Sequence, residues 1–156
     1  MFWKLRGKAF DENTGEPTRQ MQKSIVDSGT IPGLLAFDGD GPVGWIAVEP
    51  RLAYPKLAHS RILKPVDDSD VWSVTCFFVA KRARRQGVTV ELLKTAVDYV
   101  REQNGKMVEG YPVDAKKDMP APFVYTGTAA AFQKAGFIEV ARRSETRPIM
   151  RYSIGD

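Results

Sequence analysis

Residues 71–100 read VWSVTCFFVAKRARRQGVTVELLKTAVDYV, and they divide into three parts of different character. The first part, Val71–Val79, is rich in β-branched and aromatic residues, which predicts a buried strand. The last part, Val88–Val100, carries apolar residues at helical spacing with charged residues between them, which predicts an amphipathic helix. The turn Lys81–Gly87 between them is basic and ends in glycine. A strand that runs through such a turn into a helix start offers free backbone N–H groups and a positive dipole end, and it therefore predicts an anion site.

The net charge of the chain supports a local anion site. The formal net charge is +4, and four cations come from the turn alone, so the rest of the chain sums to +4 − 4 = 0. The sequence pI of about 9.2 leaves a small nucleic-acid-binding domain open as an alternative. Charge concentrated at one turn, without aromatic residues interleaved in it, favours one anionic ligand and makes a nucleic-acid partner unlikely.

The composition predicts a single globular domain over residues 1–156. Apolar residues make up 43% and charged residues 27% of the chain, and this length can bury a core without disulfides. No apolar run approaches the roughly 20 residues of a membrane span, and the N-terminus lacks the pattern of a signal peptide. The single cysteine, Cys76, cannot form an internal disulfide, which favours a reducing compartment. We therefore expect a cytoplasmic protein without a membrane partner.

Further strands and helices are predicted on both sides of residues 71–100. The run Lys106–Tyr111 predicts a strand parallel to the first one, because a helix connects the two. Two apolar runs around the Gly-rich residues 38–42 predict a β-hairpin. The other expected elements are an edge strand over Phe2–Leu5, a helix over Thr18–Ser28, a short helix through Ala129–Ala135, and strands over Phe137–Ala141 and Pro148–Ile154.

Two motifs resemble a known family. Arg84, Gly87 and Thr89 occupy the defining places of the pattern Arg/Gln-x-x-Gly-x-Gly/Ala, which is the acyl-CoA-binding motif of the GNAT superfamily of N-acetyltransferases. The segment Ala129–Phe137 resembles the helix and Gly-Phe turn near the end of such domains. Thr89 departs from the usual Gly or Ala, but it is small. The resemblance implies an α/β (α+β) fold of three layers, with a central mixed, mostly antiparallel sheet of about six to seven strands flanked by helices.

The resemblance also implies the co-substrate acetyl-CoA. Its pyrophosphate would be bound by the N–H groups and arginines of the turn, and its pantetheine arm would pair with the backbone of residues 77–79, with the N–H of Val79 polarising the thioester carbonyl. The expected cofactor-binding residues are Phe77, Phe78, Val79, Arg84, Arg85, Gln86, Gly87, Val88, Thr89 and Phe132. One histidine and one cysteine cannot supply a His/Cys metal cluster, so we expect no metal.

The reaction implied by the resemblance is direct transfer of the acetyl group to a primary amine within a ternary complex. An ammonium acceptor needs a proton acceptor before it can attack, and the candidates are Glu49 and Glu109. Phe132 stands where many members carry the tyrosine that protonates the departing thiolate, so Tyr111 and Tyr125 are the substitute candidates. Phe132 also keeps open a module that binds acyl-CoA without transferring it. The sequence leaves the acceptor undefined, and it leaves a homodimer possible.

Overall fold

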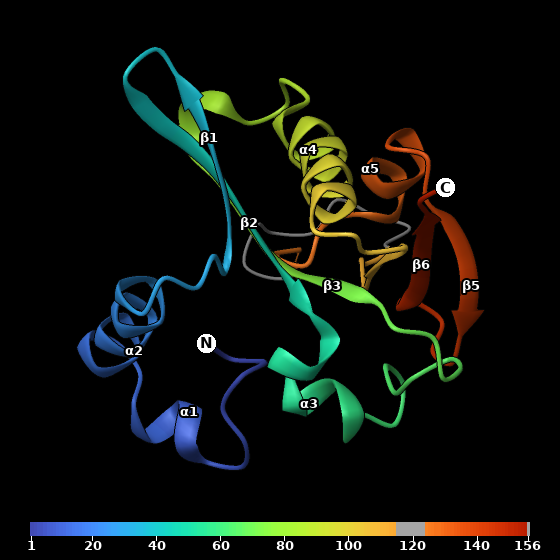
Figure 1. Cartoon of the computed structure of the whole chain (residues 1–156), viewed down its shortest axis with the longest axis horizontal. Helices are drawn as coiled ribbons and strands as arrows, with labels where there is room; N and C mark the ends of the chain where they lie inside the picture. The colour runs from blue at the N-terminus through green and yellow to red at the C-terminus, as the bar shows by residue number, and fades with distance from the viewer. Residues whose placement is uncertain (115–123, 156) are drawn as a thin grey trace.

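The computed structural model describes residues 1–114 and 124–155, and within them six strands form one mixed sheet in the order β1-β2-β3-β4-β6-β5 (Figure 1). The strands are β1 (Gly33–Asp38), β2 (Gly41–Pro50), β3 (Trp72–Val79), β4 (Met107–Gly110), β5 (Ile138–Arg142) and β6 (Pro148–Ser153). The helices are α1 (Ala9–Glu12), α2 (Glu16–Asp27), α3 (Pro55–Ala58), α4 (Val88–Glu102) and α5 (Ala129–Lys134), with short 3-10 helices η1 (Arg51–Ala53) and η2 (Lys81–Ala83). Among the six described strands, only β3 and β4 pair in parallel, which confirms the expected mixed, mostly antiparallel sheet.

Helices cover both faces of the sheet. In Figure 1, α4 and α5 lie on one side of the sheet, and α1, α2 and α3 lie on the other. The apolar side of α4 packs on the sheet through Leu92, Leu93, Ala96, Val97 and Val100, as their helical spacing predicts. On the opposite face a smaller core gathers around Tyr54, Leu57, Leu63, Tyr111 and Ile149. No helix in the described part of the chain is long and apolar enough to cross a membrane.

The parallel strands β3 and β4 separate after a short contact. They pair at only three positions, and β4 ends at Gly110 while β3 continues for five more residues. Two features cause the separation. Thr75 forms a bulge in β3, because Ala47 pairs with Cys76 and the next residue of β2 pairs with Val74. The ring of Phe132 packs against Gly110, where a Cβ atom would come within 2.0 Å of it.

The predicted edge strand at Phe2–Leu5 is wrong, because these residues form a turn. The N–H groups of Lys4 and Leu5 donate to the carbonyl of Met1, and the aromatic rings hold the turn in place. Phe2 stacks edge-on against Trp3 with ring centres 5.0 Å apart, and the Nζ atom of Lys56 lies 3.5 Å from the centre of the Phe2 ring. Apolar residues so close to the N-terminus are explained by this packing and not by β-pairing.

Candidate active site

The separation of β3 and β4 opens a groove along the free edge of β3, which we call the split groove. It has a volume of about 620 Å³ and runs between residues 77–79 of β3 and the segment 124–131. Arg84 and Thr89, from the turn before α4, line one end of it. Five of the ten predicted cofactor residues therefore line one groove: Phe77, Phe78, Val79, Arg84 and Thr89.

The turn before α4 has the geometry of an anion site. Gly87 caps the helix with a φ of 82°, a left-handed conformation that glycine adopts without a Cβ clash. The first bonds of α4 run from the N–H groups of Val90 and Glu91 to the carbonyl of Gly87, so the amides ahead of them are available to a ligand. The Nε atom of Arg84 donates to the carbonyl of Val79 over 3.1 Å, which fixes this arginine at the end of β3.

The other predicted cofactor residues have different surroundings. Arg85 is exposed in the same turn, with a φ of 62°, and the side chain of Gln86 donates to the carbonyl of Arg82 over 2.9 Å. The side chain of Val88 packs against the core beneath α4. Phe132 is fully buried and does not line the groove, because its ring packs edge-on against Phe77, with ring centres 6.1 Å apart. Phe132 thus supports the groove from beneath through Phe77, and its expected contact with a cofactor stays a prediction.

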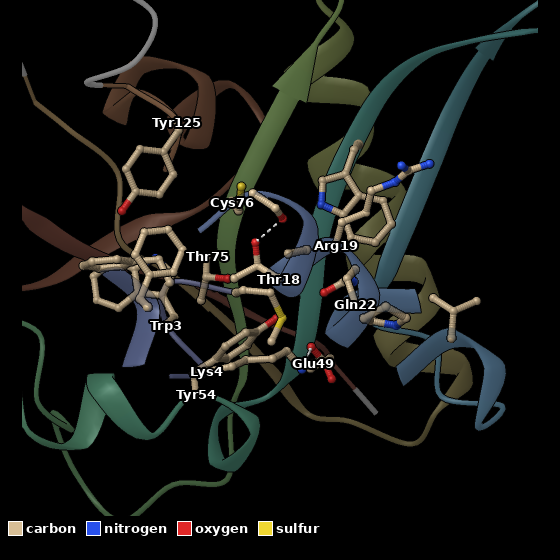
Figure 2. Close-up of a pocket in the computed structure, with 18 residues that line it drawn as sticks. Trp3, Lys4, Thr18, Arg19, Gln22, Glu49, Tyr54, Thr75, Cys76 and Tyr125 are labelled. Atoms are coloured by element: carbon tan, nitrogen blue, oxygen red, sulfur yellow. Dashed lines mark hydrogen bonds and ion pairs between the residues drawn. The ribbon is translucent and has the colours of Figure 1, made fainter. Parts of the chain in front are cut away.

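A second cavity, of about 510 Å³, lies on the face of the sheet that α2 and the N-terminal turn cover; we call it the N-terminal cavity (Figure 2). Strands β2 and β3 form its floor through Trp45, Ala47, Glu49, Thr75 and Cys76. The walls come from residues 1–4, from α1 and α2, and from side chains of residues 54 and 125. The bulge at Thr75 places two consecutive residues of β3 in this floor.

Glu49 is one of two predicted catalytic residues that line this cavity. Its side chain is 7% exposed, and its Oε2 atom lies 2.5 Å from the Nζ atom of Lys4. Apart from this ammonium, Oε2 has no hydrogen-bond partner within the described residues. The hydroxyl of Tyr54 lies beside Glu49 and Thr75, and burial, aided by the Glu49 charge, raises the pKa of Tyr54 well above its usual value. The carboxylate therefore keeps capacity to accept a further proton donor.

Tyr125 is the residue at which the two cavities meet. It lines both the split groove and the N-terminal cavity, and Figure 2 shows its ring on the same side of the N-terminal cavity as Cys76, across from Lys4 and Tyr54. Its carbonyl accepts a hydrogen bond of 2.6 Å from the N–H of Phe77. Burial raises the pKa of Tyr125, and the charge of Arg147 partly opposes this shift. A group bound in the groove and a group bound in the cavity would face each other at this junction.

Glu109 and Tyr111, the other two predicted catalytic residues, lie outside both cavities in a buried network. Glu109 is fully buried, and it accepts hydrogen bonds from Tyr111 over 2.7 Å, from the Nε atom of Arg151 over 2.7 Å, and from Arg51. The Ser73 hydroxyl lies 2.8 Å from the hydroxyl of Tyr111. The structure thus joins these two residues to each other and to two arginines, and it does not bring them to Glu49 or Tyr125.

Sequence reasoning missed Lys4 and Tyr54, which line the N-terminal cavity beside Glu49. Nothing in the local pattern identifies Lys4 and Tyr54, because both reach the cavity through tertiary packing. Tyr54 follows η1, only five residues after Glu49, and this proximity was the one available signal. Within residues 1–114 and 124–155 no cluster of three or more His, Cys, Asp or Glu residues could hold a metal ion.

Comparison with solved structures places this architecture among known acetyltransferases. A Desulfovibrio desulfuricans protein assigned to the GNAT family superimposes with a TM-score of 0.57 at 18% identity, over 94% of this chain and 89% of that one. The ribosomal-protein-alanine N-acetyltransferase of Brucella melitensis gives a TM-score of 0.56 at 18% identity, over 89% and 78%. A chain of the NatC complex bound to Gag peptide and CoA gives 0.55 at 13% identity, over 95% and 87%. At such identities the likeness concerns the fold.

Sequence comparison supplies the family. A search of curated proteins finds no match to the chain. The family model described as acetyltransferase (GNAT) family matches residues 2–125, which is most of the chain and includes the turn before α4. The matched region includes the β3 side of the split groove, and members of this family use acetyl-CoA. The chain therefore belongs to the acetyltransferase (GNAT) family and is an acyltransferase.

Proposed function

We propose that this protein transfers an acetyl group from acetyl-CoA to a primary amine by direct attack within a ternary complex. The observation that carries the proposal is the junction of the two cavities at Tyr125 and at residues 76–77 of β3. One cavity ends in an anion site, and the other contains a carboxylate that can accept a proton. An acyl donor in the groove and an amine in the cavity can therefore react without a covalent enzyme intermediate.

The split groove is the proposed site for acetyl-CoA. Amides at the start of α4 would bind the pyrophosphate, with charge-assisted contacts from Arg84 and Arg85. The arm would follow the free edge of β3. N–H groups of alternate strand residues point to the same side, so the amides of Phe77 and Val79 both face this edge. Val79 is the donor expected from the sequence. Phe77 lies nearer the N-terminal cavity, and its amide becomes available to the thioester carbonyl when the carbonyl of Tyr125 moves away.

Proton transfer is assigned to two side chains at the N-terminal cavity. Glu49 would take a proton from the incoming ammonium through water, because it lines the cavity across from Cys76 and its Oε2 atom has one ammonium partner among the described residues. The neutral amine then attacks the thioester carbonyl, and the carbon–sulfur bond breaks to give a thiolate. The nitrogen loses its remaining surplus proton to water, which leaves the neutral amide and restores the proton of the group that protonates the thiolate. Tyr125 would protonate this thiolate. Its raised pKa keeps the hydroxyl protonated at neutral pH, as a proton donor requires.

The proposal is tested in two steps. First, the affinity for acetyl-CoA is measured by calorimetry for the wild type, for R84E/R85E and for R61E/K64E. The last variant makes the same charge change in the loop after α3. Affinity should fall at least about tenfold in R84E/R85E alone, since two charge-assisted phosphate contacts become repulsive. Second, release of free CoA is followed in single turnovers with a panel of amines. Tight acetyl-CoA binding without transfer to any amine would contradict the proposed activity and indicate a module that only binds acyl-CoA.

A further inference from the structure

We infer that the acceptor is an amine with a single positive charge on an apolar, aromatic-sized body. This inference rests on the proposed function, and it concerns the chemistry of the N-terminal cavity alone. Three properties of that cavity support it: its aromatic walls, its charge balance, and the position of its one carboxylate relative to the split groove.

Aromatic rings are numerous among the side chains that line the N-terminal cavity. Six described residues supply them: Phe2, Trp3, Phe10, Trp45, Tyr54 and Tyr125. Phe2 stacks edge-on against Phe10 with ring centres 5.4 Å apart, so the N-terminal turn and α1 present one continuous wall. Burial of an apolar body against such a wall releases water from both surfaces, and an aromatic ring gains further from edge-to-face contacts. A highly hydrated acceptor would gain neither the release of water nor the edge-to-face contacts.

The charge balance of the cavity disfavours polycations. Among the described residues that line it, Glu49 has the only carboxylate, whereas the side chains of Lys4 and Arg19 are cations, so the lining side chains sum to −1 + 2 = +1. Lys4 already pairs with Glu49 over 2.5 Å, and Arg19 pairs with Glu16 over 3.3 Å. A polyamine or an aminoglycoside would bring several ammonium groups to a cavity whose carboxylate already has a partner. Like charges at close range raise the free energy of such a complex.

The side chain of Lys4 shows what the Glu49 end of the cavity accommodates. It is one primary ammonium, held by one carboxylate and 5.3 Å from the centre of the Tyr54 ring. Figure 2 shows Lys4, Tyr54 and Glu49 on one side of the cavity and Tyr125 with Cys76 on the other. An acceptor amine must lie toward Cys76 to reach the thioester, so its body lies among the rings. Among the described residues that line the cavity, a second ammonium on that body would find no further carboxylate.

The test compares 2-phenylethylamine, which is a monocation with a ring, with spermidine, which is a polycation without one. Wild-type kcat/KM for 2-phenylethylamine should exceed that for spermidine by at least about tenfold, the ratio that burial of one ring supports. Ala47→Asp then adds a carboxylate to the floor, between Trp45 and Glu49, and should narrow this ratio by about tenfold. Ala58→Asp, on the exposed surface of α3, is the matched control and should leave the ratio unchanged.

The outcomes separate the inference from the proposed function. A wild-type preference for spermidine, or an Ala47→Asp variant with an unchanged ratio, overturns the acceptor class while transfer itself stands. No transfer to either amine, nor to any other in the panel, overturns the proposed function and the inference with it. If Ala47→Asp fails to fold, as shown by its thermal unfolding, Val26→Asp replaces it. Val26 lines the same cavity from α2, where it is 53% exposed, and the same narrowing is expected.

Discussion

Glu49 and Glu109 are both buried carboxylates of one sheet, on β2 and β4, which flank β3, yet their surroundings differ in kind. Glu109 is 0% exposed, and both of its oxygens accept hydrogen bonds from arginine or tyrosine side chains. Glu49 is 5% exposed, borders a cavity, and has Lys4 as the one partner of its Oε2 atom among the described residues. A carboxylate with hydrogen-bond donors on both oxygens stabilises the structure around it. A carboxylate beside a cavity with fewer donors can still accept a proton.

The pairing partners explain where each carboxylate acts. Arg51 follows directly after β2 and also donates to the carbonyl of Leu63 over 2.8 Å, and Arg151 on β6 donates to Asp67. The network around Glu109 therefore ties the long connection between α3 and β3 to the sheet. The partner of Glu49 is Lys4 in the N-terminal turn, so this ion pair attaches only that turn, one wall of the cavity, to β2.

Glu49→Gln is expected to give the largest effect on rate. The amide keeps the shape of the side chain but cannot accept a proton, so kcat/KM should fall by about 10²- to 10⁴-fold. Steady-state kinetics with the best amine of the panel measure this fall, and far-ultraviolet circular dichroism confirms that the variant is folded. A rate within threefold of the wild type would remove Glu49 from the mechanism.

Glu109→Gln should instead reduce stability. Removal of its charge leaves the guanidinium groups of Arg51 and Arg151, whose side chains are 13% and 8% exposed, without their buried carboxylate. Loss of one partner from a buried ion pair costs about 3–5 kcal/mol of unfolding free energy. Urea unfolding measures the loss, and the rate constant per folded molecule should stay close to that of the wild type. A stable Glu109→Gln protein with a rate lost more than a hundredfold would reverse the roles of the two carboxylates.

Local sequence patterns predicted the centre of this fold well. The β-branched and aromatic content of residues 71–79, the helical spacing after Val88, and the Gly-rich hairpin turn are each patterns of a few residues. β3, α4 and the β1–β2 hairpin all lie where these patterns place them, within about two residues. The Arg84–Thr89 turn was equally local, and it predicted the position of the split groove.

What local patterns could not supply is the pairing between distant segments. Glu49 and Glu109 look alike in sequence, because each is a lone carboxylate in an apolar strand. Their difference comes from arginines 58 and 42 residues away from Glu109, and from a lysine in a turn that resembled a strand. The bulge at Thr75 is also non-local, since it depends on the register between two strands.

Tyr125→Phe, compared with Tyr111→Phe, extends the contrast to the two tyrosines. Loss of the Tyr125 hydroxyl should lower kcat by about 10- to 100-fold, at the low end for a general acid because a thiolate of pKa about 8.5 already departs readily. Tyr111→Phe should destabilise the protein by about 1–3 kcal/mol, since Glu109 and Ser73 lose a buried partner. Because burial raises the pKa of Tyr125, its hydroxyl stays protonated, and the rate ratio should be constant between about pH 6 and 9. If the two variants have equal rates, Tyr125 does not protonate the thiolate.

Asp67→Asn should give the smallest effect, because Asp67 lies at the exposed end of the Glu109 network. It accepts hydrogen bonds from Arg151 over 2.6 and 3.0 Å, and these lower the pKa of its carboxyl below the usual range, while its side chain remains 47% exposed. A carboxyl whose pKa is lower in the folded than in the unfolded chain stabilises the fold above the unfolded value of about 3.9, and this contribution is lost as the pH falls further. The urea midpoint of the variant should therefore lie slightly below that of the wild type at pH 7, by less than for Glu109→Gln, and the two midpoints should converge below about pH 4. A difference that grows as the pH falls would mean that Asp67 does not act through its ionised form.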